Sequence, residues 1–290
     1  MGGSQLTNQS GSYGTAGAGA ASNVPGARDS AVGWTDTSGN LWLFGGFGYD
    51  STGTACFNIV NASCYLNDLW EYKAGQWIWM GGPNTANDPG SFGTEGLASA
   101  SNYPSARQNA SAWMDMAGNV WIFGGNGIDS SANQNLLNDL WEYSQGRWTW
   151  VSGSQLGNAQ GSYGTLGTPS AANAPGARMA AANWIDSAGN LWVFGGLGND
   201  SANNYGPMND LWEFRGGQWV WMGGNSVCCT VGTGSNIILG AASPGSIPAP
   251  RYSSMEWTAP SGSFWLFGGG IGFQPNQPAA NFSDLWMYQP

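Results

Sequence analysis

Four copies of one sequence unit constrain the fold of this chain more than any other feature. Each copy has a proline followed three residues later by an arginine, then a tryptophan, an apolar stretch ending in Phe-Gly-Gly, and Asp-Leu-Trp. Three copies close with Trp-x-Trp. The arginines are 71 to 79 residues apart, at Arg28, Arg107, Arg178 and Arg251. Because such a unit cannot bury its apolar face alone, neighbouring units are expected to pack on one another.

Each unit is predicted to form four short antiparallel strands. The first strand follows the arginine, and a Gly-Asn turn such as Asp36–Asn40 connects it to LWLFGG, an apolar run typical of a buried strand. The Gly-Gly pair would let neighbouring backbone or rings approach closely. DLWEY is the third strand, and a Gly-containing turn leads to Trp-x-Trp, the fourth. A four-stranded meander repeated around an axis is the blade of a β-propeller.

The expected fold is therefore all-β, with four repeats of about 72 residues and a last blade that lacks its outermost strand within this chain. Residues 1–290 form one propeller region in this prediction. Its repeats and the long loops between them have these bounds: repeats at approximately 25–80, 104–151, 175–222 and 250–290, and loops at 1–24, 81–103, 152–174 and 223–249.

LWLFGG, DLWEY and the tryptophan strand that follows resemble the kelch repeat, in particular that of bacterial galactose-oxidase-like, kelch-containing proteins. The resemblance covers all 290 residues and implies a kelch-type propeller. Ordinary kelch units have about 50 residues, and the excess here lies in two loops per unit. The copper site of galactose oxidase includes imidazole ligands, and this chain has no histidine, so that site cannot be built here.

Composition narrows the classes of function and partner. The formal net charge is −10, from 17 acidic and 7 basic residues, so the surface would repel phosphate backbones and anionic lipid. No apolar run reaches the length of a membrane span. Without histidine, and without a nucleophile elbow or phosphate loop, the sequence offers no catalytic residue. We therefore expect no nucleic-acid partner, no membrane span and no enzymatic activity, and an enzyme of an unrecognised kind stays open as an alternative.

The last strand is predicted to have an open edge. The chain ends at DLWMYQP, where a fourth Trp-x-Trp would begin, and Met1 aligns with the residues that follow each Trp-x-Trp. An unpaired edge invites pairing with another strand. Three interpretations stay open: a stretch of a longer tandem array, a small ring with trimmed ends, or a protomer completed by a neighbouring copy. The predicted open-edge strand consists of Asp284, Leu285, Trp286, Met287 and Tyr288.

The repeated arginines and aspartates are expected to lie on the face of the propeller that carries the long loops. Arg–Asp pairs that fix where each loop re-enters the sheet are the favoured interpretation. The alternative is a ring of guanidinium groups around the channel that binds an anion or a sugar. The residues concerned are Arg28, Arg107, Arg178, Arg251, Asp68, Asp139, Asp210 and Asp284.

Two further sets of loop residues are weaker candidates for binding. Asp50, Asp129 and Asp200 recur before serine and could hold Ca²⁺, but one carboxylate per loop favours a turn-forming role, and no cofactor is expected. Exposed loop aromatics could stack on sugars. These are Tyr13, Phe47, Tyr49, Phe92, Tyr103, Tyr163, Tyr205 and Phe273.

The four cysteines lie in loop segments. Disulfides Cys56–Cys64 and Cys228–Cys229 would suit an oxidising compartment, and unpaired thiols are the alternative. The predicted function is a non-enzymatic structural, adhesive or assembly module, secreted or at the cell surface. It would form an oligomer or filament by strand donation, with other copies of itself or further repeats of the same parent chain as partners. A propeller that binds polysaccharide through the long-loop face is the alternative.

Overall fold

The computed structural model describes residues 3–53, 64–228, 245–272 and 280–290. Their regular secondary structure consists of twenty β-strands and no α-helix, so no described helix could cross a membrane. The chain divides into two compact units, Met1–Gly157 and Asn158–Pro290, and each is described by itself.

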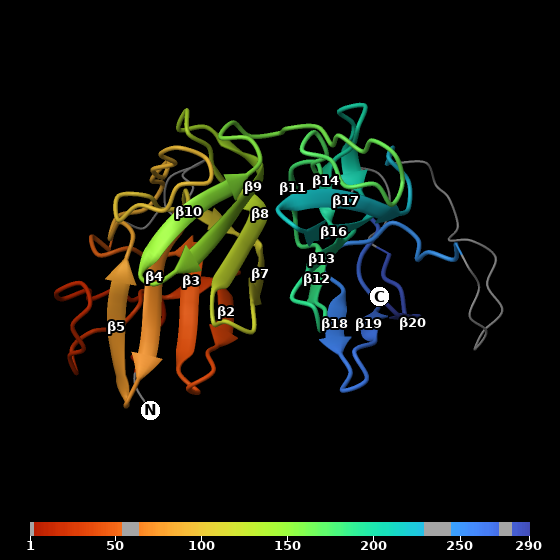
Figure 1. Cartoon of the computed structure of the whole chain (residues 1–290). Coiled ribbons are helices and arrows are strands. Elements are labelled where there is room, and N and C mark those ends of the chain that lie inside the picture. The colour runs from red at the N-terminus through yellow and green to blue at the C-terminus, as the bar shows by residue number, and fades with distance from the viewer. Residues whose placement is uncertain (1–2, 54–63, 229–244, 273–279) are drawn as a thin grey trace. The chain divides into compact units, whose positions relative to one another are not determined.

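The first unit contains two five-stranded antiparallel sheets (Figure 1). The first sheet consists of β1 (Arg28–Asp29), β2 (Val32–Thr35), β3 (Leu41–Gly48), β4 (Tyr65–Lys73) and β5 (Gln76–Gly81). Its order is β2-β3-β4-β5, and β1 pairs with the C-terminal end of β3. The second sheet repeats this order with β6 (Arg107–Gln108), β7 (Ser111–Met114), β8 (Val120–Ile128), β9 (Gln134–Ser144) and β10 (Arg147–Ser152).

The second unit contains a complete sheet and a shorter one. The third sheet is formed by β12 (Ala182–Ile185), β13 (Leu191–Phe194), β16 (Leu211–Arg215) and β17 (Gln218–Gly223), and a small sheet beyond it by β11 (Arg178–Met179), β14 (Leu197–Asn199) and β15 (Tyr205–Pro207). The fourth sheet has β18 (Met255–Thr258), β19 (Phe264–Phe267) and β20 (Leu285–Tyr288). Among the described residues, no strand pairs with the outer edge of β20.

The strands differ from the prediction at the Gly-Gly pair. In the first two sheets the LWLFGG-type strand continues past it, and the arginine forms a short fifth strand against the continuation, with Arg28 opposite Gly48. In the first unit the glycines are needed because Gly45 and Gly46 have φ of 65° and 103°, and a Cβ on Gly45 would lie 2.7 Å from the Arg107 carbonyl oxygen of the next sheet.

Local turn chemistry explains the meander. In the first hairpin the Asp36 carboxylate accepts backbone N–H groups of Ser38 and Asn40, and Gly39 has φ of 83°. The β4–β5 hairpin has a two-residue turn, Ala74–Gly75, with φ of 51° and 83°, which is the type I′ geometry that matches strand twist. Both turns recur in the second and third sheets.

Each complete sheet has two faces, defined by strand alternation. The front face of the first sheet carries Val32, Trp34, Trp42, Phe44 and Leu69, and the back face carries Leu41, Leu43 and Tyr72. Corresponding residues of the other sheets define their front and back faces.

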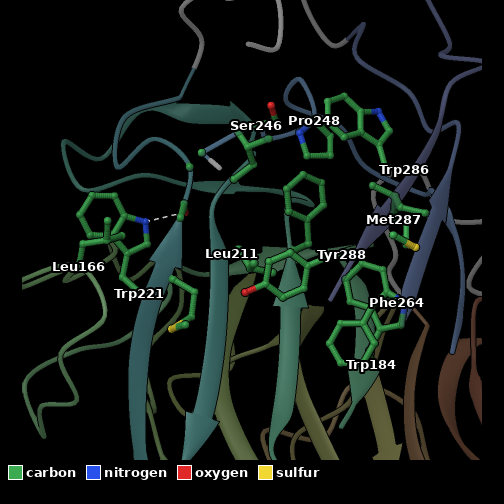
Figure 2. Close-up of a pocket in the computed structure, with 17 residues that line it drawn as sticks. Leu166, Trp184, Leu211, Trp221, Ser246, Pro248, Phe264, Trp286, Met287 and Tyr288 are labelled. Carbon is green, nitrogen blue, oxygen red and sulfur yellow. Dashed lines mark hydrogen bonds between the residues drawn. The ribbon is translucent and has the colours of Figure 1, made fainter. Parts of the chain in front are cut away.

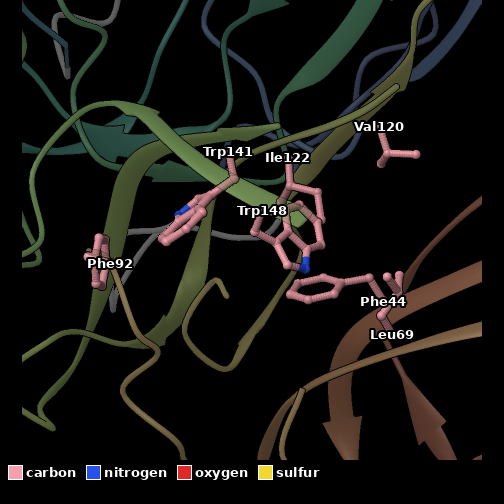
Figure 3. Packing of buried hydrophobic residues seen from close by; sticks show 7 residues of the cluster. All are labelled: Phe44, Leu69, Phe92, Val120, Ile122, Trp141 and Trp148. Carbon is pink, nitrogen blue, oxygen red and sulfur yellow. The ribbon is translucent and has the colours of Figure 1, made fainter. Parts of the chain in front are cut away.

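Within each unit, the front face of one sheet packs on the back face of the next. In the first unit Phe44 and Leu69 join Val120, Ile122, Trp141 and Trp148 in one core, with Phe92 from a loop (Figure 3). In the second unit Trp184, Phe194 and Leu211 pack on Phe264 and Leu266. The tryptophans therefore serve mainly in sheet-to-sheet packing, as their fixed spacing predicts. An all-β fold of antiparallel sheets packed in this manner is consistent with a β-propeller.

Candidate functional site

Each repeated arginine forms a bidentate ion pair with the aspartate of its own repeat. Arg107 Nη1 and Nη2 lie 2.6 and 2.7 Å from the two Asp139 carboxylate oxygens, and neither side chain is exposed. Arg107 also donates to the carbonyl oxygens of Ser105 and Gly124 and to the Ser105 hydroxyl. Since all five N–H groups of Arg107 are used, this guanidinium has none left for an anion or a sugar.

The same arrangement recurs around the other three aspartates. Each carboxylate also accepts the indole N–H two residues later, at 2.7 Å in every repeat, from Trp70, Trp141, Trp212 and Trp286. Burial alone would raise the pKa of Asp68, but the Arg28 charge and the hydrogen bonds lower it below its usual range. The pair fixes the start of each DLW strand. The paired residues are Arg28–Asp68, Arg107–Asp139, Arg178–Asp210 and Arg251–Asp284.

Loop tyrosines complete two of these networks, a role that the sequence motifs did not predict. The Tyr13 hydroxyl donates to Asp68 and the Tyr163 hydroxyl to Asp210, both at 2.7 Å, and burial raises the pKa of both phenols. The recurring GSYGT and GSFGT strings in the long loops were the available signal. The second repeat has Phe92 in this place, and its ring packs on Trp141 in a tilted arrangement.

The loop aromatics are therefore poor candidates for sugar stacking. Tyr13, Tyr49, Phe92 and Tyr163 are buried, and the Phe47 ring contacts Tyr65. Tyr103 packs at the edge of the first unit's core, Tyr205 is exposed, and Phe273 lies outside the described residues. The expectation of exposure is wrong for Tyr13, Phe92 and Tyr163, because their long loops fold back on the tryptophan strands and bury these rings.

The calcium candidates Asp50, Asp129 and Asp200 are buried and brace their own loops. Asp129 accepts backbone N–H groups of Ser131, Asn133 and Gly157 and the side-chain amide of Asn135. Such donors occupy the oxygens that a cation would need. Within the described ranges no three His, Cys, Asp or Glu residues cluster as metal ligands would.

Cys64 and Cys228 are both disulfide-bonded and buried. The predicted partners, Cys56 and Cys229, lie outside the described residues, so the pairings Cys56–Cys64 and Cys228–Cys229 stay predictions.

A groove beside β20 is the main candidate for binding. It is a cavity of about 370 Å³ between the third and fourth sheets (Figure 2). Phe264 stacks on Trp184 at its base, with centroids 5.3 Å apart, and Tyr288 lies beside them. Trp286 and Pro248 line one end and Trp221 and Leu166 the other. The lining is aromatic and aliphatic, with few polar groups, so it favours an apolar occupant.

The first unit shows what occupies the corresponding space. There Trp148 of β10 packs 5.7 Å from Phe44, 6.4 Å from Trp141 and 4.9 Å from Tyr143, measured between ring centroids (Figure 3). The counterparts of these three rings are Phe194, Trp286 and Tyr288, which all line the groove. The groove in the fourth sheet therefore corresponds to the space that Trp148, the first Trp of a Trp-x-Trp strand, fills in the second sheet.

Comparison with known proteins supports the fold. No family model matches the chain, and no curated protein matches it. A solved structure titled "Structure of YjhT" is similar over 92% of this chain and 70% of that one, with 14% identity and a TM-score of 0.53. A fungal alcohol oxidase of the AA5 family, solved in complex with copper, is similar over 90% of this chain and 54% of the oxidase chain. The identity is 13% and the TM-score is 0.39. A TM-score below 0.5 does not establish a shared fold.

The likeness to YjhT supports a kelch or galactose-oxidase-like fold. The prediction that the chain is not an enzyme is wrong as an exclusion, because the missing histidine and motifs rule out only particular sites, and a fold of this kind can carry others. At 14% identity the likeness to YjhT shows the fold alone and assigns no activity. The copper site implied by the resemblance does not fit, because the chain has no histidine to supply imidazole ligands.

Proposed function

We propose that the chain is an assembly module whose fourth sheet is completed by a β-strand from outside residues 1–290. The observation that carries this proposal is the groove beside the outer edge of β20, at the place that Trp148 fills in the second sheet. In this proposal the four sheets are blades of a kelch-type propeller, and the added strand makes the fourth blade like the other three. Strand addition uses main-chain hydrogen bonds for affinity and side-chain pockets for specificity.

The register of the added strand follows from the second sheet. There Trp148 lies opposite Tyr143 and Trp150 opposite Trp141, with a bulge before Ser152. The corresponding residues of β20 are Tyr288 and Trp286. The added strand would run antiparallel to β20, with its first tryptophan opposite Tyr288 and its second opposite Trp286.

The energetics favour a strand that is already ordered. Burying roughly 200 Å² per indole at about 25 cal/mol per Å² gives about 5 kcal/mol for each ring. Ordering six residues costs about 1–2 kcal/mol each, which is of the same size as the gain from two rings. A free peptide should therefore bind weakly, and a strand held in a folded partner should bind more tightly.

The proposed location is extracellular or at the cell surface. The disulfide bonds of Cys64 and Cys228 support it, because such bonds persist in oxidising compartments. Other copies of this chain or further repeats of a longer parent chain could both supply the strand.

A labelled peptide with the sequence of Arg215–Gly224, RGGQWVWMGG, tests the proposal by fluorescence anisotropy against the full chain. We expect saturable binding, at least tenfold weaker for a peptide with alanine in place of both tryptophans. The Tyr288→Ala chain should also lose at least tenfold, whereas the exposed-site control Met116→Ala should not. The proposal fails if both peptides bind equally, or if neither binds at about 1 mM.

A further inference from the structure

The front face of the fourth sheet is an uncovered apolar surface. Five of the fourteen exposed large hydrophobic side chains among the described residues lie on this face, in β18, β19 and β20. Met255, Phe267 and Leu285 form one row across the sheet and are 60, 39 and 56% exposed. Trp257, Trp265 and Met287 form the next row. A contiguous apolar patch of this kind is typical of a protein–protein interface.

The same face is covered wherever a sheet has a following neighbour in its unit. The counterparts of Phe267 are Phe44 and Phe194, which are 1 and 4% exposed. Each is packed against the back face of the next sheet, in the first and second cores respectively. The front face of the fourth sheet therefore has the residue pattern of a surface built to receive a back face.

One substitution makes this face more apolar than its counterparts. The first three sheets carry Glu71, Glu142 and Glu213 where the fourth carries Met287. Burial raises the pKa of Tyr143 and of Tyr288, and the charge of a nearby glutamate of the preceding sheet raises each further. These glutamates are Glu71 for Tyr143 and Glu213 for Tyr288. With Met287, the fourth sheet lacks the acidic residue found at this position in the other sheets, so a partner needs no polar group to match it.

The back face of the first sheet has the complementary pattern. Leu41 is 48% exposed and Gly33 is exposed, while Leu43 and Tyr72 are both half-buried. The counterparts of Leu41 in the second and fourth sheets, Val120 and Phe264, are 4 and 1% exposed because a front face covers them. None of these back-face positions of the first sheet carries a charge, which suits the uncharged row of the fourth sheet that contains Met255.

We infer that the front face of the fourth sheet packs on the back face of the first sheet of a second copy of this chain. The contact repeats between copies the front-to-back packing seen within each unit. It is head-to-tail, so the two contacting surfaces differ, and successive copies can add in the same direction. This inference rests on the proposed role in assembly and names the partner, and it concerns the front face rather than the groove.

Two variants test it by sedimentation velocity on the full chain. Met255→Glu with Leu285→Glu charges the front face of the fourth sheet, and Thr35→Glu with Leu41→Glu charges the back face of the first. These four side chains are not buried, so both variants should fold. We expect the unaltered chain to form species of twice its mass or more, and each variant alone to be a monomer. An equimolar mixture of the two should restore the dimer, because each retains one intact surface.

Two control variants separate this contact from a general effect of added charge. Leu97→Glu with Met116→Glu changes the charge equally at exposed sites off both faces and should leave association intact. Met287→Glu restores the residue type of the other sheets and should weaken association with little effect on folding.

A monomeric unaltered chain overturns the inference. So does one variant that dimerises alone, since that result indicates a contact between two identical surfaces. Binding of the RGGQWVWMGG peptide uses the groove residues Phe264 and Tyr288, which point to the opposite side of the sheet from Met255. A monomer that still binds the peptide therefore refutes the head-to-tail contact alone, and a dimer that does not bind it refutes the proposed strand addition alone.

Discussion

The second and fourth sheets carry the same motif in different surroundings. In the second sheet Asp139, Leu140 and Trp141 are fully buried beneath β10 and a loop. In the fourth sheet the Asp284 side chain is 39% exposed, Leu285 is 56% exposed and Trp286 is half-buried. The inner contacts survive this difference, since Arg251 still binds Asp284 through two hydrogen bonds and Trp286 still donates to it.

The difference shows that the Arg–Asp–Trp network forms without a Trp-x-Trp strand beside it. The burial of the network, in contrast, depends on that strand. An ion pair buried on both sides and a pair of the same geometry whose carboxylate is partly exposed have different energetic consequences when broken. The comparison can therefore be tested by matched substitutions in the two sheets.

The largest effect is expected at the ion pair. Asp139→Ala leaves the Arg107 guanidinium buried without its carboxylate and should lower the free energy of unfolding by about 5 kcal/mol. Asp284→Ala should cost clearly less, because the Asp284 carboxylate is 39% exposed and its removal lets water reach the buried Arg251 guanidinium. Urea unfolding of both variants, followed by circular dichroism, measures the two values. Equal losses would contradict the role assigned to burial.

Removing the Trp148 ring should open, in the second sheet, a space like the groove of the fourth sheet. Trp148→Ala deletes a side chain that contacts Phe44, Trp141 and Tyr143, and should cost about 3 kcal/mol. The same variant should bind the RGGQWVWMGG peptide less tightly than the groove of the fourth sheet does, because β10 still occupies the edge of β9. The urea midpoint and peptide anisotropy give the two values, and an unchanged midpoint would contradict the packing role.

The loop tyrosine provides a smaller comparison. Tyr163→Phe removes a 2.7 Å hydrogen bond to the buried Asp210 carboxylate and should cost about 2 kcal/mol. The second sheet already has Phe92 at this position, beside an ion pair that the Ser105 hydroxyl supplements. Phe92→Leu is a matched control that alters ring packing without a hydroxyl. A negligible loss for Tyr163→Phe in urea unfolding would show that the hydroxyl contributes nothing.

The last expected effect is a pH dependence that comes from Glu256 of the fourth sheet. Burial raises the pKa of Glu256 to about 7 in the folded chain, from the usual value near 4.3 in an unfolded one. The folded state therefore holds more protons between these values, so the free energy of unfolding falls as pH rises from about 4.5 to 7. The second sheet has Ala112 at this position.

Glu256→Gln should flatten that slope when melting temperature is measured between pH 5 and 8. Glu95→Gln changes the net charge equally at an exposed site and serves as the control. A slope that persists in Glu256→Gln would assign the effect to another group.

The repeat, the strands and the two hairpin turns could be predicted from the sequence because they depend on local features. Asp36, Gly39 and Gly75 act within a few residues of themselves, and the alternation around Trp-x-Trp fixes which side chains share a face. The open edge of β20 was predicted on the same grounds, since it follows from comparing one repeat with the others.

Only the tertiary structure decided which of these equivalent residues are buried and which are available. Tyr13 reaches Asp68 across 55 residues, and the recurring GSYGT string marks this tyrosine without showing what it packs against. The groove and the exposed front face likewise exist because no described strand or sheet covers them, which is a property of neighbours rather than of the motif. Burial depends on what packs against a residue, so identical motifs give a closed core in one sheet and a binding surface in another.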